Sequence, residues 1–159
     1  MSKHTLDSTI HRFFAIQFNQ AFWKMLSKPS ITVEEGYELI DIAHASNHHW
    51  RFAGTALHKQ RGAYVIARVY LAVGRPDTAM IYAKRCMEMT NENPEGIKDF
   101  DYAFAHEILW KCTDAKGLTE EAAKHKAEAR RLGDLIVDSE DKKIFDGDFE
   151  TVYTKVINN

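Results

Sequence analysis

Apolar residues recur at intervals of three and four along most of this chain, a rhythm that predicts amphipathic α-helices. No segment alternates apolar and polar residues for long enough to predict a strand, so we expect an all-α protein without a sheet. The spacing predicts six main helices, at about 6–27, 32–49, 57–73, 76–91, 98–113 and 119–136. We group these helices into three antiparallel hairpins, at about 6–50, 55–91 and 97–136.

Capping and turn residues mark the ends of several of these helices. Asp7 or Ser8 is a suitable N-cap for the first helix, and Thr32 with Glu35 three residues later forms a capping box for the second. Gly74 can adopt the left-handed conformation that closes a helix, and Pro76 is tolerated in the first turn of the next one. The middle pair of helices is therefore expected to turn sharply at residues 74–76.

The last segment, residues 137–159, differs in character because it is acidic. Aromatic and aliphatic residues recur there at helical spacing, which predicts a short amphipathic helix at about Phe149–Ile157 that caps the last hairpin. The Asp146-Gly147-Asp148 run lacks the ligand spacing of an EF-hand loop, so we interpret it as a solvated turn.

A step of 43 residues relates the three predicted hairpins to one another. It links three sets of small or apolar residues: Gly36, Ala79 and Ala122; Ala43, Cys86 and Ala129; and Phe22, Val65 and Ile108. Internal repetition of this kind is typical of helical repeat proteins, and a period near 43 is closer to HEAT or armadillo repeats than to the shorter tetratricopeptide unit. A bundle of three unrelated hairpins is the alternative.

The middle hairpin, Gln60–Met89, resembles a tetratricopeptide repeat. Ala67, Tyr70, Gly74, Ala79 and Ala83 fall where that family places small, aromatic, small, small and bulky residues, although Ala83 is smaller than the usual occupant. The resemblance implies a single domain over residues 1–159, built as a right-handed superhelix of about three antiparallel helical hairpins plus a C-terminal capping helix.

Composition narrows the classes of partner and compartment. A chain of 159 residues with a formal net charge of -2 fits one domain and lacks the basic excess of a general nucleic-acid binder. No apolar run approaches the length that spans a bilayer, and the N-terminus shows no secretory signal. Cys86 and Cys112 lie on apolar helical faces, which is typical of buried free thiols in a reducing compartment. We therefore expect a cytoplasmic protein with neither nucleic acid nor membrane as partner.

Eight histidines raise the question of a metal site. Asp41, His44 and His48 share one helical face, and His44 and His48 have the spacing that can hold one zinc ion. The HExxH, CxxC and paired Glu-x-x-His patterns of metalloenzymes are missing, as are a GxSxG motif and a glycine-rich phosphate loop. We therefore predict a protein that is not an enzyme and binds neither metal nor cofactor.

The resemblance implies that the first helix of each hairpin lines a concave surface that holds an extended peptide or a partner helix. The middle hairpin would present Arg61, Tyr64 and Arg68, and two arginines beside a tyrosine can pair with carboxylates of a ligand. The adjacent hairpins would contribute Phe18, Phe22 and Met25 on one side and His106, Glu107 and Trp110 on the other. In the alternative interpretation, Arg61 and Arg68 pair with acidic residues of neighbouring helices.

These observations leave three hypotheses for function. The first is a non-catalytic module that binds a protein or peptide segment bearing acidic groups in the concave groove. The asparagines of the family's carboxylate clamp are absent, so the C-terminal tail of a chaperone is not the expected ligand. The second is a self-associating structural or adaptor subunit that uses exposed aromatic residues at Trp50, Phe52 and Trp110. The third is a metal-dependent enzyme that uses His44 and His48.

Overall fold

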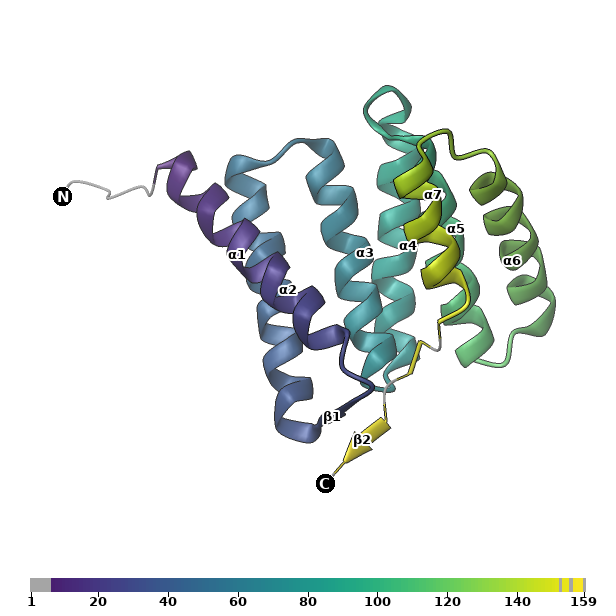
Figure 1. The fold of residues 1–159 in the computed structure, drawn as a ribbon, viewed down its shortest axis with the longest axis horizontal. Helices are drawn as coiled ribbons and strands as arrows, with labels where there is room; N and C mark the ends of the chain where they lie inside the picture. The colour runs from purple at the N-terminus through teal and green to yellow at the C-terminus, as the bar shows by residue number, and fades with distance from the viewer. Residues whose placement is uncertain (1–6, 152, 155, 159) are drawn as a thin grey trace.

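The computed structural model of this protein describes residues 7–151, 153–154 and 156–158, most of which are helical. Six helices follow one another as neighbours in space: α1 (Ser8–Leu26), α2 (Val33–Ala53), α3 (Ala56–Ala72), α4 (Pro76–Glu92), α5 (Asp99–Ala115) and α6 (Thr119–Asp134). A short 3₁₀ turn, η1 (Pro94–Gly96), precedes α5, and a seventh helix, α7 (Ser139–Phe149), lies in front of α5 in Figure 1. The all-α class is confirmed, while the superhelical and tetratricopeptide-like arrangement stays a prediction.

The helices begin and end where the capping residues predict. The Asp7 carboxylate accepts a hydrogen bond from the Thr9 amide at 2.9 Å. The Thr32 hydroxyl accepts from the Glu35 amide at 3.1 Å, and the Glu35 carboxylate accepts from the Thr32 amide at 2.8 Å. Gly74 has a φ of 73°, the left-handed value that lets the chain turn from α3 into α4.

The positions related by the 43-residue step all lie in the core. The structure buries all nine of them: Gly36, Ala79 and Ala122; Ala43, Cys86 and Ala129; and Phe22, Val65 and Ile108. The central helix α3 is buried most completely, because α2, α4 and α5 all pack against it. Residues on α3 therefore meet side chains from several other elements.

The C-terminal helix lies earlier in the chain than predicted. The helix ends at Phe149 instead of beginning there, and of the predicted helical segment Val152 and Lys155 lie outside the described residues. The Asp138 carboxylate caps α7 by accepting from the amides of Glu140 and Asp141 at 3.0 and 2.9 Å. The Asp146-Gly147-Asp148 run is the last part of this helix, so its interpretation as a solvated turn was wrong.

A short parallel pairing joins two distant parts of the chain. Strand β1 (Ser30–Thr32) lies between α1 and α2, and it pairs with strand β2 (Val156–Asn158) near the C-terminus (Figure 1). Each strand has only three residues, too few for an alternating pattern to reveal. The pairing brings the C-terminal segment from α7 back to the α1–α2 connection.

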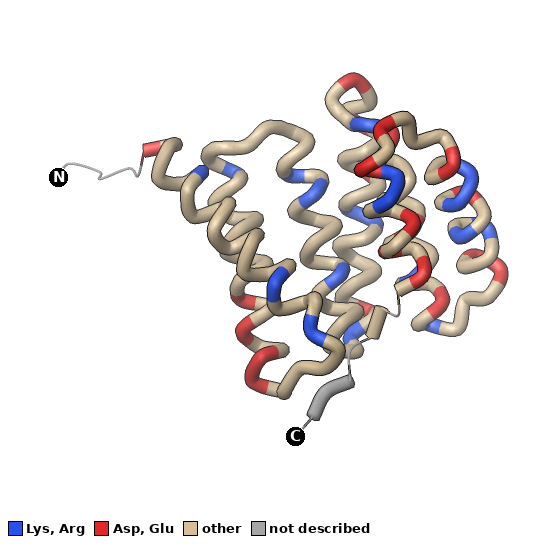
Figure 2. Tube along the Cα trace, viewed as in Figure 1, with Lys and Arg blue, Asp and Glu red and all other residues tan. Residues whose placement is uncertain are grey.

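Charge is distributed unevenly over the helices. Figure 2 shows acidic and basic residues interspersed along α6 and α7, whereas α1 carries few of either kind. None of the helices formed by the described residues is both long and apolar enough to cross a membrane.

Candidate functional site

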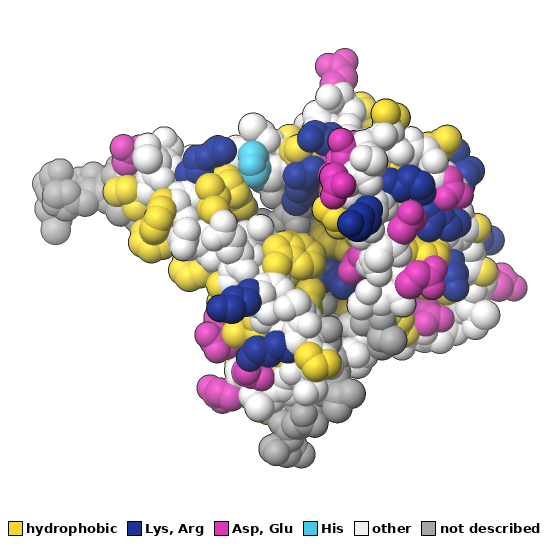
Figure 3. Space-filling model, in the orientation of Figure 1, with side chains coloured by type: hydrophobic (Ala, Val, Ile, Leu, Met, Phe, Trp, Pro, Cys, Tyr) yellow, Lys and Arg dark blue, Asp and Glu magenta, His cyan; other side chains and the backbone are white. Residues whose placement is uncertain are grey.

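Helices α1, α3, α5 and α7 enclose a cleft with a volume of about 760 Å³. Helices α3 and α5 form its floor, α1 forms one wall and α7 the other, and Figure 3 shows the surface hollowed between them. The lining residues are Asn19, Trp23, Gln60, Arg61, Tyr64, Val65, Phe100, Asp101, Phe104, Glu140, Lys143, Ile144, Gly147, Asp148 and Thr151. A cleft of this volume lies within the range of known ligand sites.

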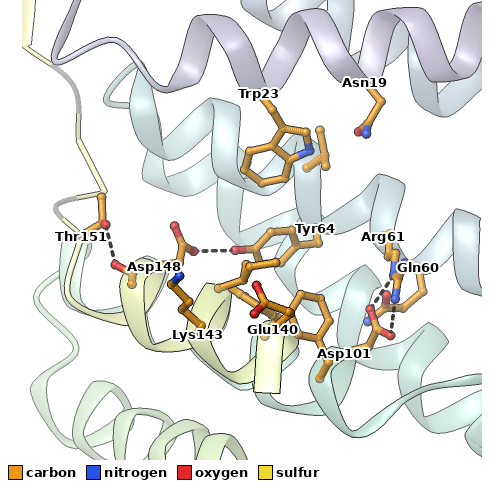
Figure 4. A pocket seen from close by; sticks show the side chains of 15 residues that line it. Asn19, Trp23, Gln60, Arg61, Tyr64, Asp101, Glu140, Lys143, Asp148 and Thr151 are labelled. Carbon is orange, nitrogen blue, oxygen red and sulfur yellow. Dashed lines mark hydrogen bonds and ion pairs between the residues drawn. The ribbon is translucent and has the colours of Figure 1, made fainter. Parts of the chain in front are cut away.

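Apolar side chains supply most of the cleft's surface. Trp23 projects from α1 toward the floor in Figure 4, and 40% of it is exposed. On the opposite wall, Ile144 of α7 is 56% exposed. The rings of Phe100 and Phe104 pack edge to face on the floor, with their centroids 4.6 Å apart. The cleft therefore presents apolar surface that the chain itself leaves uncovered.

At one end of the cleft, Arg61 pairs with Asp101. The guanidinium donates through Nε and Nη2 to the two carboxylate oxygens, at 2.7 and 2.9 Å (Figure 4). Asp101 is buried, whereas 44% of the Arg61 side chain is exposed. The hydrogen bond to Asp101 raises the pKa of Arg61 above its usual value. Two of the five N–H donors of Arg61 are thus used inside the protein.

Arg68 lies beneath the cleft in a network of buried charges. Its Nη2 is 3.0 Å from Asp148 Oδ1 on α7, and its Nη1 is 3.5 Å from Glu107 Oε1 on α5. The Tyr64 hydroxyl lies 3.1 Å from Asp148 Oδ2 and 3.2 Å from Glu107 Oε2. Lys111 pairs with Glu107 and donates to the backbone oxygen of Asp148 at 2.8 Å. Two cations and two carboxylates therefore meet where α3, α5 and α7 converge.

Burial sets the electrostatics of this network. It raises the pKa of Glu107, against the opposing effect of Lys111 and Arg68. It also raises the pKa of the Tyr64 hydroxyl, which stays protonated and can donate to either carboxylate. The network contains two basic side chains, Arg68 and Lys111, and two acidic ones, Glu107 and Asp148, so each formal charge has a partner of opposite sign.

The structure brings only some of the predicted groove residues to the cleft. Arg61 and Tyr64 line it, but Arg68 and Glu107 lie in the network below and expose little surface. The expectation that both arginines face an open groove therefore fails for Arg68. The physical reason is α7, which covers the α5 side of the concave face and supplies Asp148 as the partner of Arg68.

The remaining predicted residues lie elsewhere. On α1, Phe22 is fully buried, Met25 is partly buried against the core, and Phe18 stacks near His49 with ring centroids 6.0 Å apart. On α5, His106 Nδ1 lies 3.2 Å from His125 Nδ1, and the Trp110 ring packs against Phe149 with centroids 4.7 Å apart.

The sequence interpretation missed the residues of the far wall. Ile144 and Asp148 were assigned to an acidic tail, although Phe145 and Phe149 show the four-residue spacing that could have indicated a helix here. Nothing in the sequence indicated that Asp148 would pair with Arg68, because eighty residues separate them.

The histidines and cysteines do not converge on a reactive centre within the part of the chain that the structure describes. Here, no group of three or more metal-ligating side chains is arranged to hold an ion. The imidazole of His44 lies 3.1 Å from the Tyr70 hydroxyl. Burial raises the pKa of both Cys86 and Cys112 to about 12, which keeps these thiols protonated.

Comparison of this chain with protein-family models, with curated proteins and with solved structures finds no match.

Proposed function

We propose that this protein is a non-catalytic binding module whose cleft holds a segment of another protein. The observation that carries the proposal is the pair of exposed apolar walls. Trp23 on α1 and Ile144 on α7 face the same cleft, and both leave large apolar surface in contact with water. Covering such surface is favourable by roughly 25 cal/mol per Å². A segment that inserts an apolar side chain between the two walls would gain that free energy.

Polar groups at the edge of the cleft define what else the segment would meet. Arg61 Nη1 has no hydrogen-bond partner among the described residues, so an acidic group on the segment can pair with it there. Glu140 and Lys143 on the exposed side of α7 offer one charge of each sign. We therefore propose a ligand with an apolar anchor and a carboxylate directed toward Arg61. We place the protein in the cytoplasm, where free buried cysteines such as these are ordinary.

A peptide-display selection on the full-length protein tests this proposal. Peptides enriched on the wild type should lose binding to Trp23→Ala and to Ile144→Ser. The matched control is Ile81→Ser, because Ile81 is also an exposed isoleucine (66%) but lies on α4, away from the cleft. Equal binding to all three variants, or loss with Ile81→Ser alone, would exclude the cleft as the binding site.

A second candidate function is self-association through the first hairpin. Phe13 on α1 and Phe52 on α2 are 58% and 55% exposed, and Ile10 and Phe14 on α1 are also exposed. Exposed aromatic groups of this kind often mark protein interfaces. Light scattering should then give a mass above that of one chain, and Phe13→Ser with Phe52→Ser should reduce it to one chain. A wild type that is monomeric at high concentration would exclude this candidate.

A further inference from the structure

The surface beneath α7 is covered by one of the chain's own helices. We define this α7-binding surface by the side chains and backbone that α7 contacts: Tyr64, Arg68, Phe104, Trp110, Lys111, Arg130 and Gly133. Helix α7 meets it through Phe145, Asp148 and Phe149, three residues that share one helical face. This spacing is the usual pattern by which an amphipathic helix fills a groove.

Two places in this surface fit aromatic rings. Phe145 packs directly on the backbone of Gly133, where an added Cβ would lie 2.1 Å from its ring. Its centroid is also 5.0 Å from that of Phe104, in an edge-to-face arrangement. Phe149 packs against Trp110, and the Arg130 guanidinium lies 5.0 Å from the Phe149 centroid.

Between the two rings, the surface requires a carboxylate. The side chains of Arg68 and Lys111 are 6% and 1% exposed, and without Asp148 they would face only Glu107. An uncompensated buried charge is strongly unfavourable, so a helix that binds here must supply an anion. Lys111 also donates to the backbone oxygen of Asp148, which matches the free carbonyls and negative dipole at a helix C-terminus.

The helix that fills this surface is itself weak. It has 11 residues, and helices of that length are marginal in isolation. Gly147 lies within it although nothing is found within 4 Å of the position of an added Cβ, so packing does not require glycine there. A glycine inside a helix makes the helix less stable than alanine would at the same position. The anchoring side chains, more than the helix backbone, therefore hold α7 in place.

We propose that α7 is an exchangeable occupant and that its binding surface accepts, from another chain, an amphipathic helix with an aromatic-x-x-carboxylate-aromatic motif. The partner is recognised by two aromatic rings one turn apart and by a carboxylate that reaches Arg68 and Tyr64. Because Tyr64 and Asp148 also line the open cleft, the two sites are continuous on one concave face. The inference does not depend on the cleft ligand, since α7 itself supplies the recognition pattern.

The experiment uses a fluorescent peptide with the sequence of residues 138–151 and three full-length proteins. Asp148→Asn weakens the internal α7 but leaves Arg68 and Lys111 requiring a carboxylate, so it should bind the peptide at least tenfold more tightly than the wild type does. Gly147→Ala strengthens the internal helix and should bind it about fivefold more weakly than the wild type. The control peptide, with asparagine at the position of Asp148, should lose at least tenfold in affinity for the Asp148→Asn protein. Equal affinity of all three proteins, or of both peptides, overturns the proposal.

Hydrogen exchange on the wild type keeps the proposal testable if Asp148→Asn does not fold. The amides of α7 should exchange at least a hundredfold faster than those of α3, because α7 detaches without global unfolding. If α7 and α3 exchange at the same rate in a single cooperative opening, α7 is a fixed part of the core and the proposal fails.

Discussion

The concave face of this protein has two halves that treat similar residues differently. Arg61 and Arg68 lie seven residues apart on α3, and both pair with aspartates on other helices. In the open half, 44% of the Arg61 side chain stays exposed beside the cleft. In the covered half, α7 leaves only 6% of Arg68 exposed. The sequence around the two arginines does not distinguish them. Helix α7 does, because it buries Arg68 and leaves Arg61 exposed beside the cleft.

The difference shows how burial changes the energetics of an ion pair. A pair at the edge of solvent, such as Asp101 with the half-exposed Arg61, gains little, because water screens it and competes for its hydrogen bonds. A buried pair is costly to form, but removing one partner leaves the other charge stranded at low dielectric. The covered half should therefore be sensitive to loss of an anchoring group, and the open half should tolerate the same loss.

The largest expected effect is that of Arg68→Ala. Removing this cation leaves Glu107 and Asp148 facing Lys111 alone, which should lower the free energy of unfolding by about 3–5 kcal/mol. Urea denaturation followed by circular dichroism measures the change. A loss below about 1 kcal/mol would mean that buried Arg68 contributes no more to stability than a member of an exposed ion pair does.

The next effect is that of Gly133→Ala, which tests the packing of α7 in the covered half. A Cβ at this position would meet the Phe145 ring at 2.1 Å, so α7 must shift. Overpacking of this kind should cost about 1–3 kcal/mol of stability. The matched control is Gly147→Ala, which has open space and should stabilise by up to about 1 kcal/mol. Thermal melts measure both variants. If both substitutions shifted the melting temperature in the same direction, close packing of Phe145 on Gly133 would be contradicted.

A smaller effect should come from acid, through histidines that lie outside the cleft. Burial lowers the pKa of His106 and His125 between α5 and α6, and of His49 between α1 and α2. Because these pKa values are lower in the folded state, the unfolded chain binds more protons as the pH falls below about 6.5. Stability should be full above that pH and decrease below it. Melting temperatures between pH 7.5 and 5.5 that do not fall would contradict the assignment.

The smallest effect is expected for Arg61→Ala in the open half. Asp101 is buried under Arg61, but it lines the cleft, so water can solvate its carboxylate once the arginine side chain is gone. Stability should therefore fall by only about 1 kcal/mol. The same variant should weaken binding of peptides that carry a carboxylate. Denaturation and peptide binding measured side by side separate the two effects, and a destabilisation as large as that of Arg68→Ala would remove the distinction.

The sequence predicted the first six helices well because their signals are local. Thr32 with Glu35, and Gly74 with Pro76, define helix ends through contacts within a few residues. The candidate site depends on contacts distant in sequence, such as Asp148 with Arg68, which no periodicity encodes. The interpretation that the arginines pair with acidic residues of neighbouring helices was confirmed for both. The remaining predicted groove residues were separated by packing, since Phe22 faces the core and Trp110 supports α7.

The central claim is that the cleft between α1 and α7 binds a protein segment, and the three tryptophans allow a direct test. Trp23 lines the cleft, whereas Trp50 and Trp110 lie outside it. A peptide selected on the wild type is titrated into ¹⁵N-labelled full-length protein while the indole N–H signals are followed by nuclear magnetic resonance. The account predicts that the Trp23 signal shifts and saturates while the Trp110 signal stays in place. A Trp23 signal that does not move, with binding measured independently, would contradict it.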